Sequence, residues 1–112
     1  MLDRKQTDFL YWHAVSKMRT SDFEGACTLF RLLRAAHPER HDVSLGYVYS
    51  LMRRGSLDEA SAIVAELRRR PMRPEEMALL GRLQRRCEFE RNRAAQAQQA
   101  LPRLRPLMGA TT

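Results

Sequence analysis

The chain repeats a short stretch of its own sequence after 34 residues. Residues 21–26 read SDFEGA and residues 55–60 read GSLDEA, and both stretches end in alanine after a large apolar and an acidic residue. The same shift continues further along the chain, where it places Phe30 on Val64. A period of this size indicates stacked copies of one supersecondary unit, so it limits the possible folds more than any other feature.

Small side chains recur at the same period, as Ala26, Ala60 and Ala94. Two antiparallel helices approach closely only where a side chain is small, so these alanines mark expected contacts within helical hairpins. Thirty-four residues is also the period of the tetratricopeptide (TPR) helix–turn–helix unit. The chain resembles that family further in a tight turn at Gly55 and in prolines near the repeat ends.

Helix breakers and apolar periodicity predict an all-α fold of three TPR-like hairpins, about six helices, in a short solenoid with a concave groove. The repeats are expected over residues 7–38, 41–72 and 75–101, within one domain over residues 1–101. A flexible tail is expected over residues 102–112. The individual helices are expected over residues 4–19, 22–37, 42–54, 57–70, 74–87 and 92–101.

Several residues predict where these helices begin and end. Ser21 with Glu24, and Ser56 with Glu59, have the spacing of capping boxes. Gly55 is the expected left-handed stop of the helix before it. The third repeat lacks a glycine at the matching position, so one long helix over residues 74–101 is the alternative to a third hairpin.

The composition limits where such a chain can act. No stretch approaches the length of a membrane-spanning apolar run, and the N-terminus does not have the pattern of a secretory signal peptide. Cys27 and Cys87 lack metal-ligand spacing and are expected to be reduced and buried, which fits a cytosolic compartment. The net charge is +7, and all but two of the 20 basic residues are arginines spread over the chain. This charge indicates either solvated arginines, an acidic protein partner or, less strongly, nucleic acid.

The first helix of each TPR pair lines the concave side of the stack, so the 34-residue shift groups neighbours on that side. Three repeats curve too little to fill their own concavity, and an exposed apolar patch of this kind is typical of a binding site. The alternative is that the same residues form ordinary core. The expected groove residues are Tyr11, Leu45, Leu79, Val15, Tyr49, Leu83, Met18 and Met52. The expected electrostatic rim, which would meet acidic residues of a partner, is Arg19, Arg53, Arg54, Arg82 and Arg86.

The sequence offers no pattern typical of an enzyme, a metal site or a cofactor site. His37 and His41 are four residues apart, but Pro38 interrupts the helix that would place them on one face. Glu75 and Glu76 are adjacent, so a helix points them to different sides. We therefore expect neither catalytic residues nor a bound metal or cofactor.

The first third of the chain carries a more specific resemblance. Its elements are Arg4-Lys5-Gln6 at the opening, aromatic and apolar residues over 9–12, a run from Ala26-Cys27 to Leu33, and His37-Pro38-Glu39 at the repeat end. This pattern is similar to that of the small TPR chaperones of bacterial type III secretion, in particular the Y-type (SctY/YscY) chaperones. The later part, residues 79–101, matches them more loosely.

The resemblance implies a non-catalytic cytoplasmic chaperone in a virulence-associated protein-transport system. Its partner would be the X-type export protein of the same system, held as a heterodimer before export and delivered to the export gate. Chaperones of the needle subunit are also small TPR proteins and are the rival interpretation. The chain departs from the Y-type pattern in being more basic and in lacking a turn glycine in its third repeat.

Two further interpretations belong to other functional classes. A basic helical-repeat protein could bind nucleic acid through an arginine cluster, although no aromatic residues are interleaved with it. A self-associating TPR scaffold is the other, and self-association in the absence of a client is left open. The arginine cluster consists of Arg68, Arg69, Arg70, Arg82, Arg85 and Arg86.

Overall fold

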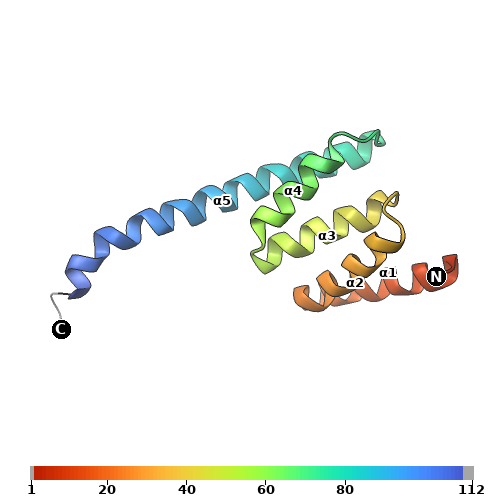
Figure 1. Cartoon of the computed structure of the whole chain (residues 1–112), viewed down its shortest axis with the longest axis horizontal. Coiled ribbons are helices and arrows are strands. Elements are labelled where there is room, and N and C mark those ends of the chain that lie inside the picture. Colours follow the sequence, from red (N-terminus) through yellow and green to blue (C-terminus); the bar gives the residue numbers. More distant parts are fainter. Residues whose placement is uncertain (1, 110–112) are drawn as a thin grey trace.

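The protein is all-helical, and Figure 1 shows its helices in order along the chain. The structure, a computed structural model, describes the backbone of residues 2–109 and the side chains of residues 2–100, and these residues contain no strand. The helices are α1 (Arg4–Arg19), α2 (Phe23–Ala36), α3 (His41–Arg54), α4 (Leu57–Leu67) and α5 (Pro74–Gly109). The first four helices begin and end within a few residues of the expected positions.

Capping residues define the start of α1 and the end of α3. Asp3 caps α1 reciprocally with Gln6: the Gln6 amide donates to Asp3 Oδ1 at 2.8 Å, and the Asp3 amide donates to Gln6 Oε1 at 3.0 Å. Gly55 ends α3 in the left-handed conformation with φ 92°, as expected. Such a reversal is strained for other residues, so the glycine sets the turn between α3 and α4.

The two expected capping boxes are wrong. Asp22, not Ser21, caps α2, because its carboxylate accepts from the Gly25 amide at 2.9 Å. Ser56 does precede α4, but its hydroxyl makes no capping bond and instead accepts from Arg54 Nε at 3.1 Å. At the start of α2, the carboxylate of Asp22 therefore takes the capping role that was expected of the Ser21 hydroxyl.

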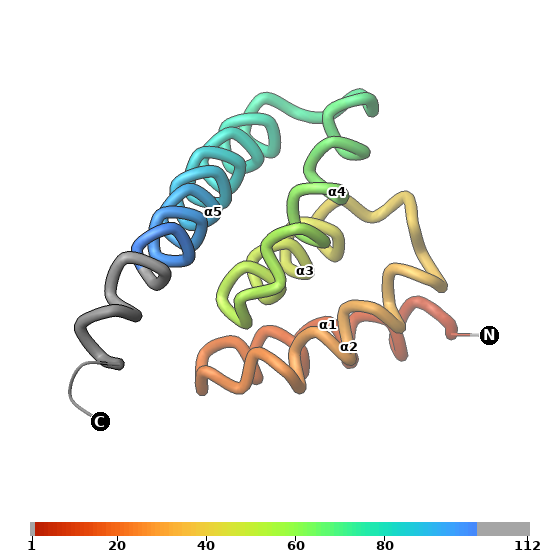
Figure 2. The backbone as a smooth tube through the Cα atoms, turned by 60° about the vertical axis from the view of Figure 1, so that its left-hand side comes forward, coloured from red at the N-terminus to blue at the C-terminus, as the bar shows by residue number. Residues whose placement is uncertain are grey.

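The helices form two antiparallel hairpins, α1–α2 and α3–α4, followed by α5. Helices α1, α3 and the start of α5 run in the same direction on one side of the molecule, while α2 and α4 return on the other (Figures 1 and 2). Helix α3 packs against each of the other four helices, whereas α1 and α5 do not contact one another. A concave side therefore lies above α3, between α1 and α5.

The core lies between the helices of each hairpin and between the hairpins. Ala26 and Ala60 are fully buried, which agrees with close helix contacts at the repeated alanines. The largest fully buried apolar side chains come from α2, α3 and α4 and include Phe30, Leu33, Leu51 and Leu67. Burial of such side chains contributes about 1.5–3 kcal/mol each and is the main stabilising term.

Polar contacts on the convex side hold the first hairpin on the second. Arg34 of α2 pairs with Glu66 of α4, with 2.7 Å between Nη2 and Oε2. The Tyr47 hydroxyl accepts from Arg31 Nε at 3.1 Å and donates to Glu59 Oε1 at 2.9 Å, so it bridges α2 and α4 from α3. These contacts fix the relative position of the two hairpins.

The expected sixth helix does not exist as a separate element. Helix α5 runs without a break through residues 87–92, where a turn was expected. Residues 87–92 contain neither glycine nor proline, and Phe89 stands where the second repeat has its turn glycine. Ala94, the third repeated alanine, is exposed instead of lying at a helix contact. The alternative of one long helix is therefore the correct one.

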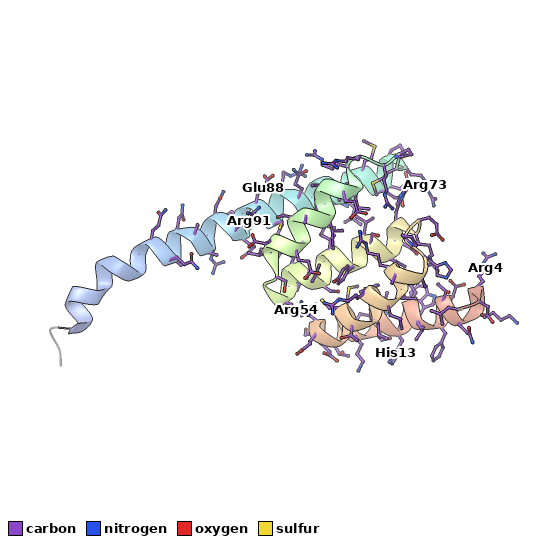
Figure 3. All side chains as sticks on the ribbon, viewed as in Figure 1. Arg4, His13, Arg54, Arg73, Glu88 and Arg91 are labelled. Carbon is purple, nitrogen blue, oxygen red and sulfur yellow. The ribbon has the colours of Figure 1, made fainter. Side chains whose placement is uncertain are left out.

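The helix also continues past the expected stop at Pro102 as far as Gly109. The flexibility expected over residues 102–112 stays a prediction, because residues 110–112 lie outside the described part. Before that region, Arg91 is paired with Asp58 of α4 at 3.3 Å, and every side chain from residue 91 to residue 100 is exposed. Figure 3 shows α5 extending beyond Arg91, away from the two hairpins.

Candidate binding groove

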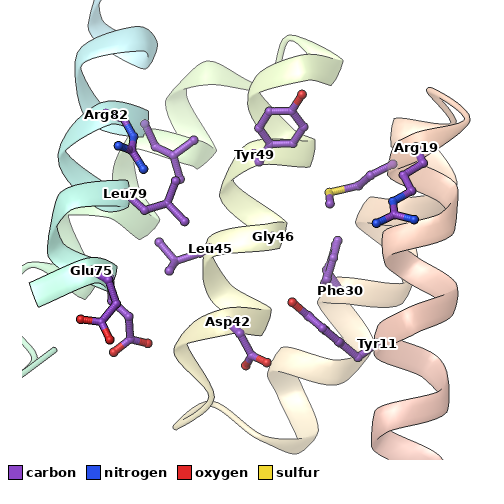
Figure 4. A pocket seen from close by; sticks show the side chains of 13 residues that line it. Tyr11, Arg19, Phe30, Asp42, Leu45, Gly46, Tyr49, Glu75, Leu79 and Arg82 are labelled. Carbon is purple, nitrogen blue, oxygen red and sulfur yellow. The ribbon is translucent and has the colours of Figure 1, made fainter. Parts of the chain in front are cut away.

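A groove of about 730 Å³ lies on the concave side of the protein, above α3 (Figure 4). Its lining comes from α1, α3 and α5, with one residue from α2. The residues that line it are Tyr11, Met18, Arg19, Phe30, Asp42, Leu45, Gly46, Tyr49, Glu75, Glu76, Leu79, Arg82 and Leu83. Three helices that are distant in sequence therefore present one continuous surface.

The floor of the groove depends on a glycine. A Cβ added to Gly46 would lie 2.6 Å from Phe30 Cζ, closer than such atoms approach in proteins. Because Gly46 has no side chain, the Phe30 ring of α2 can lie between α1 and α3 and line the groove. Phe30 meets the Tyr11 ring edge-on, with 6.1 Å between centroids, so core and groove share this contact.

The apolar lining of the groove is only partly accessible, because Phe30, Leu45 and Leu83 are buried. Leu79 of α5 keeps 37% of its surface exposed, and Tyr11 and Tyr49 are half-buried. Arg40 lies over the Tyr11 ring at 5.3 Å, and burial together with the charge of Asp42 raises the pKa of the Tyr11 phenol. Tyr11 therefore presents a neutral hydroxyl and an aromatic face to anything that enters.

Three carboxylates gather at one end of the groove, where α3 and α5 begin. Asp42 is paired with Arg40 at 2.7 Å, and Glu76 lies 3.7 Å from Arg73 Nε. Burial alone would raise the pKa of Asp42, but the hydrogen bond and charge of Arg40 outweigh it, so the pKa lies below its ordinary value. Glu75, the third carboxylate, is exposed.

Two arginines lie at the opposite end of the groove. Figure 4 shows Arg82 on the α5 wall and Arg19 on the α1 wall, both away from Asp42 and Glu75. Both arginines are exposed and line the groove. The groove thus combines an apolar centre with an acidic end and a basic end.

The structure brings together six of the eight expected groove residues: Tyr11, Met18, Leu45, Tyr49, Leu79 and Leu83. The other two lie elsewhere. Val15 is partly buried against the core, and Met52 is buried within it. Each of the two lies 34 residues from a residue that does line the groove. The 34-residue period aligns equivalent positions, but it does not predict how far each helix is rotated toward the core.

Of the arginines expected at the electrostatic rim, only some lie at the groove. Arg19 and Arg82 line the groove, whereas Arg53 is stacked on Phe23 at 5.1 Å and Arg54 is bonded to Ser56. Arg86 is exposed on α5 but does not line the groove. Only the two arginines nearest the apolar centre therefore belong to the site.

Sequence reasoning missed the acidic end and the floor. The 34-residue shift contains the signal for the former, because Asp8, Asp42 and Glu76 form an acidic column one turn before the column of Tyr11. Gly46 and Phe30 had no such signal. Their proximity depends on how α2 packs behind α3, which a single-helix pattern does not contain.

No family model matches the chain, and neither a curated protein nor a solved structure matches it significantly. Within residues 2–109, no helix is both long enough and apolar enough to cross a membrane. The described side chains also contain no cluster of three or more potential metal ligands.

Proposed function

We propose that this protein is a chaperone that holds an apolar helical segment of a client protein in the groove above α3. The observation that carries the proposal is an accessible apolar groove with two half-buried tyrosines, Tyr11 and Tyr49, on its walls. Such a groove suits an amphipathic helix, which buries its apolar face against neighbouring helices. The two hairpins and α5 would form a short TPR-like solenoid.

The resemblance to Y-type chaperones of type III secretion supports a client class. The client would be the X-type export protein, bound as a heterodimer in the bacterial cytoplasm before its delivery to the export gate. Tyrosine and methionine on the groove walls fit this role, because tyrosine gives a large contact area and methionine adapts its shape. Neither catalysis nor a cofactor is part of the proposal.

The test is co-expression with the X-type protein, followed by size-exclusion chromatography. We expect one co-eluting complex from the wild-type chain. The double variant Tyr11→Asp with Tyr49→Asp is expected to weaken binding at least about 100-fold while keeping its helical content, because two charges would enter the apolar walls.

The matched control is Phe9→Asp, which changes an aromatic side chain of α1 that is 70% exposed and does not line the groove. The control should still form the complex. Separate elution of wild-type chain and X-type protein at micromolar concentration would contradict the proposed client. Complex formation by the double variant would contradict the groove.

The needle subunit is the rival client and is tested in the same assay. Co-elution with the needle subunit but not with the X-type protein would move the chain to that chaperone class. The nucleic-acid alternative has less support, because Arg70 is bonded to Glu66 and to the Pro38 carbonyl, and Arg82 lines an apolar groove. A gel shift that persists at physiological salt would favour it.

A further inference from the structure

The groove carries exposed charged side chains of opposite sign, one carboxylate and two guanidinium groups. Glu75 and Arg82 both lie on the α5 wall, and Arg19 lies on the α1 wall. None of the three takes part in an ion pair among the described side chains. The other two carboxylates of the groove, Asp42 and Glu76, are already paired with arginines outside the lining. The available charges are therefore one anion and two cations.

These charges have a defined spacing. Glu75 and Arg82 are seven residues apart on one helix, which is two turns or about 10.5 Å along the axis. Arg19 lies across the groove at the Arg82 end (Figure 4). The apolar centre, with Leu45 and Leu79, lies between the two charged ends.

The groove lies between two helices that form its walls. Helices α1 and α5 both pack on α3 but do not contact each other. A helix packed on α3 between these two walls would have its axis about 8–10 Å from the axis of α3. Such a helix would run along α5, and its own side chains two turns apart would match the Glu75–Arg82 spacing.

We propose, building on the chaperone function above, that the groove selects an amphipathic client helix with an acidic and a basic residue two turns apart (i and i+7). The acidic residue contacts Arg19 and Arg82, and the basic residue contacts Glu75. Apolar residues at i+3 and i+4 face Leu45, Leu79 and the two tyrosines. The acidic contact carries more of the selectivity, because two cations face it and the chain has a net charge of +7.

The second half of the chain's own α5 does not have this pattern. After Glu90 the sequence contains arginines but neither aspartate nor glutamate. The same segment of a second copy of the chain therefore has no carboxylate that could pair with Arg19 and Arg82. A segment of a different protein with mixed charge is the occupant that the groove fits.

The test uses the full chain and synthetic helical peptides that share one apolar face. The peptides differ only in their charged positions. Three carry Glu and Lys, Lys and Lys, or Gln and Gln at i and i+7, and a fourth carries Glu at i and Lys at i+5, outside the apolar face. Binding is measured by fluorescence anisotropy at low and physiological salt. We expect the Glu/Lys i, i+7 peptide to bind about tenfold more tightly than the others at low salt, with a smaller advantage as salt rises.

Charge reversal in the protein identifies the contacts. Arg82→Glu is expected to remove most of the preference for the Glu/Lys peptide, and Glu75→Lys a smaller part. Arg85→Glu is the matched control, because Arg85 is exposed on α5 outside the groove and its reversal should preserve the preference.

The outcomes separate this inference from the proposed function. Equal binding of all four peptides, abolished by Tyr11→Asp with Tyr49→Asp, would overturn the charge selectivity and leave the groove as the binding site. Equal sensitivity of the preference to Arg85→Glu and Arg82→Glu would also overturn it. If no peptide binds, the groove itself is wrong and both proposals fail.

Discussion

Gly46 lies where the core of the protein meets the groove. Phe30 of α2 is fully buried and packs against the open side of this glycine. The ring cannot retreat from a larger residue without displacing the side chains that surround it, because protein interiors are close-packed. One residue without a side chain thus shapes the floor of the groove and the packing of the first hairpin on α3.

We expect Gly46→Ala to destabilise the protein by about 1–3 kcal/mol, because overpacking against Phe30 outweighs the better helix propensity of alanine. Gly81→Ala is the control within another helix. There an added Cβ meets only the end of the Arg85 side chain, at 3.6 Å, so the change should be neutral or stabilising by up to about 1 kcal/mol. Urea unfolding followed by circular dichroism measures both, and equal stability of the two variants would contradict the close contact.

Helix α5 consists of a packed part and an unpacked part. Leu80, Leu83 and Cys87 lie one turn apart and are buried against the rest of the core. This spacing is typical of a helix that buries one face. From Arg91 to residue 100 all side chains are exposed, so this region adds little buried surface. The first three to four turns of α5 therefore complete the fold, and the described turns after Arg91 do not.

Truncation separates the two parts of α5. A chain ending at residue 93 should keep a melting temperature within a few degrees of the full chain, because it keeps every side chain that is buried within residues 74–100 of α5. A chain ending at residue 82 loses Leu83 and Cys87 and should be destabilised by about 2–5 kcal/mol. Thermal melts followed by circular dichroism test this, and a large loss of stability in the longer truncation would show that residues beyond 93 pack on the body.

The whole molecule is elongated. Its radius of gyration is 17.6 Å, and its principal extents are 62 × 27 × 21 Å. A compact chain of this length has a radius of gyration of about 13 Å. The difference arises because α5 continues past the hairpins instead of folding back on them (Figure 1). The segment that a third hairpin would have folded back on the body therefore keeps all its described side chains, residues 91–100, exposed.

Small-angle X-ray scattering of the monomer distinguishes an extended α5 from a third hairpin. We expect a radius of gyration near 17.6 Å for the full chain and a clear decrease for the chain ending at residue 93. Light scattering on the same sample is needed to establish the monomer, since a dimer would also raise the value. A monomer near 13 Å would mean that the second half of α5 folds back on the body.

Helix breakers and apolar periodicity were sufficient to predict the first four helices, and the 34-residue period was sufficient to group most of the residues that line the groove. It works because each hairpin repeats the same local contacts, so Ala26 and Ala60 are buried in equivalent places and Tyr11, Leu45 and Leu79 meet on one face. These relations depend on residues within one helix or one hairpin. The sequence by itself therefore determined the helical class, the two hairpins and six of the eight groove residues.

Only the tertiary structure decided which of the aligned residues face the groove. Met52 belongs to the same column as Met18 but is buried, because α3 contacts four helices and has less free surface than α1. Phe30 reaches the groove through the space left by Gly46, and the acidic and basic ends form where three helices meet. The sequence left a third hairpin and one long helix as alternatives for residues 74–101, and the structure shows the long helix, whose side chains from residue 91 to residue 100 are all exposed.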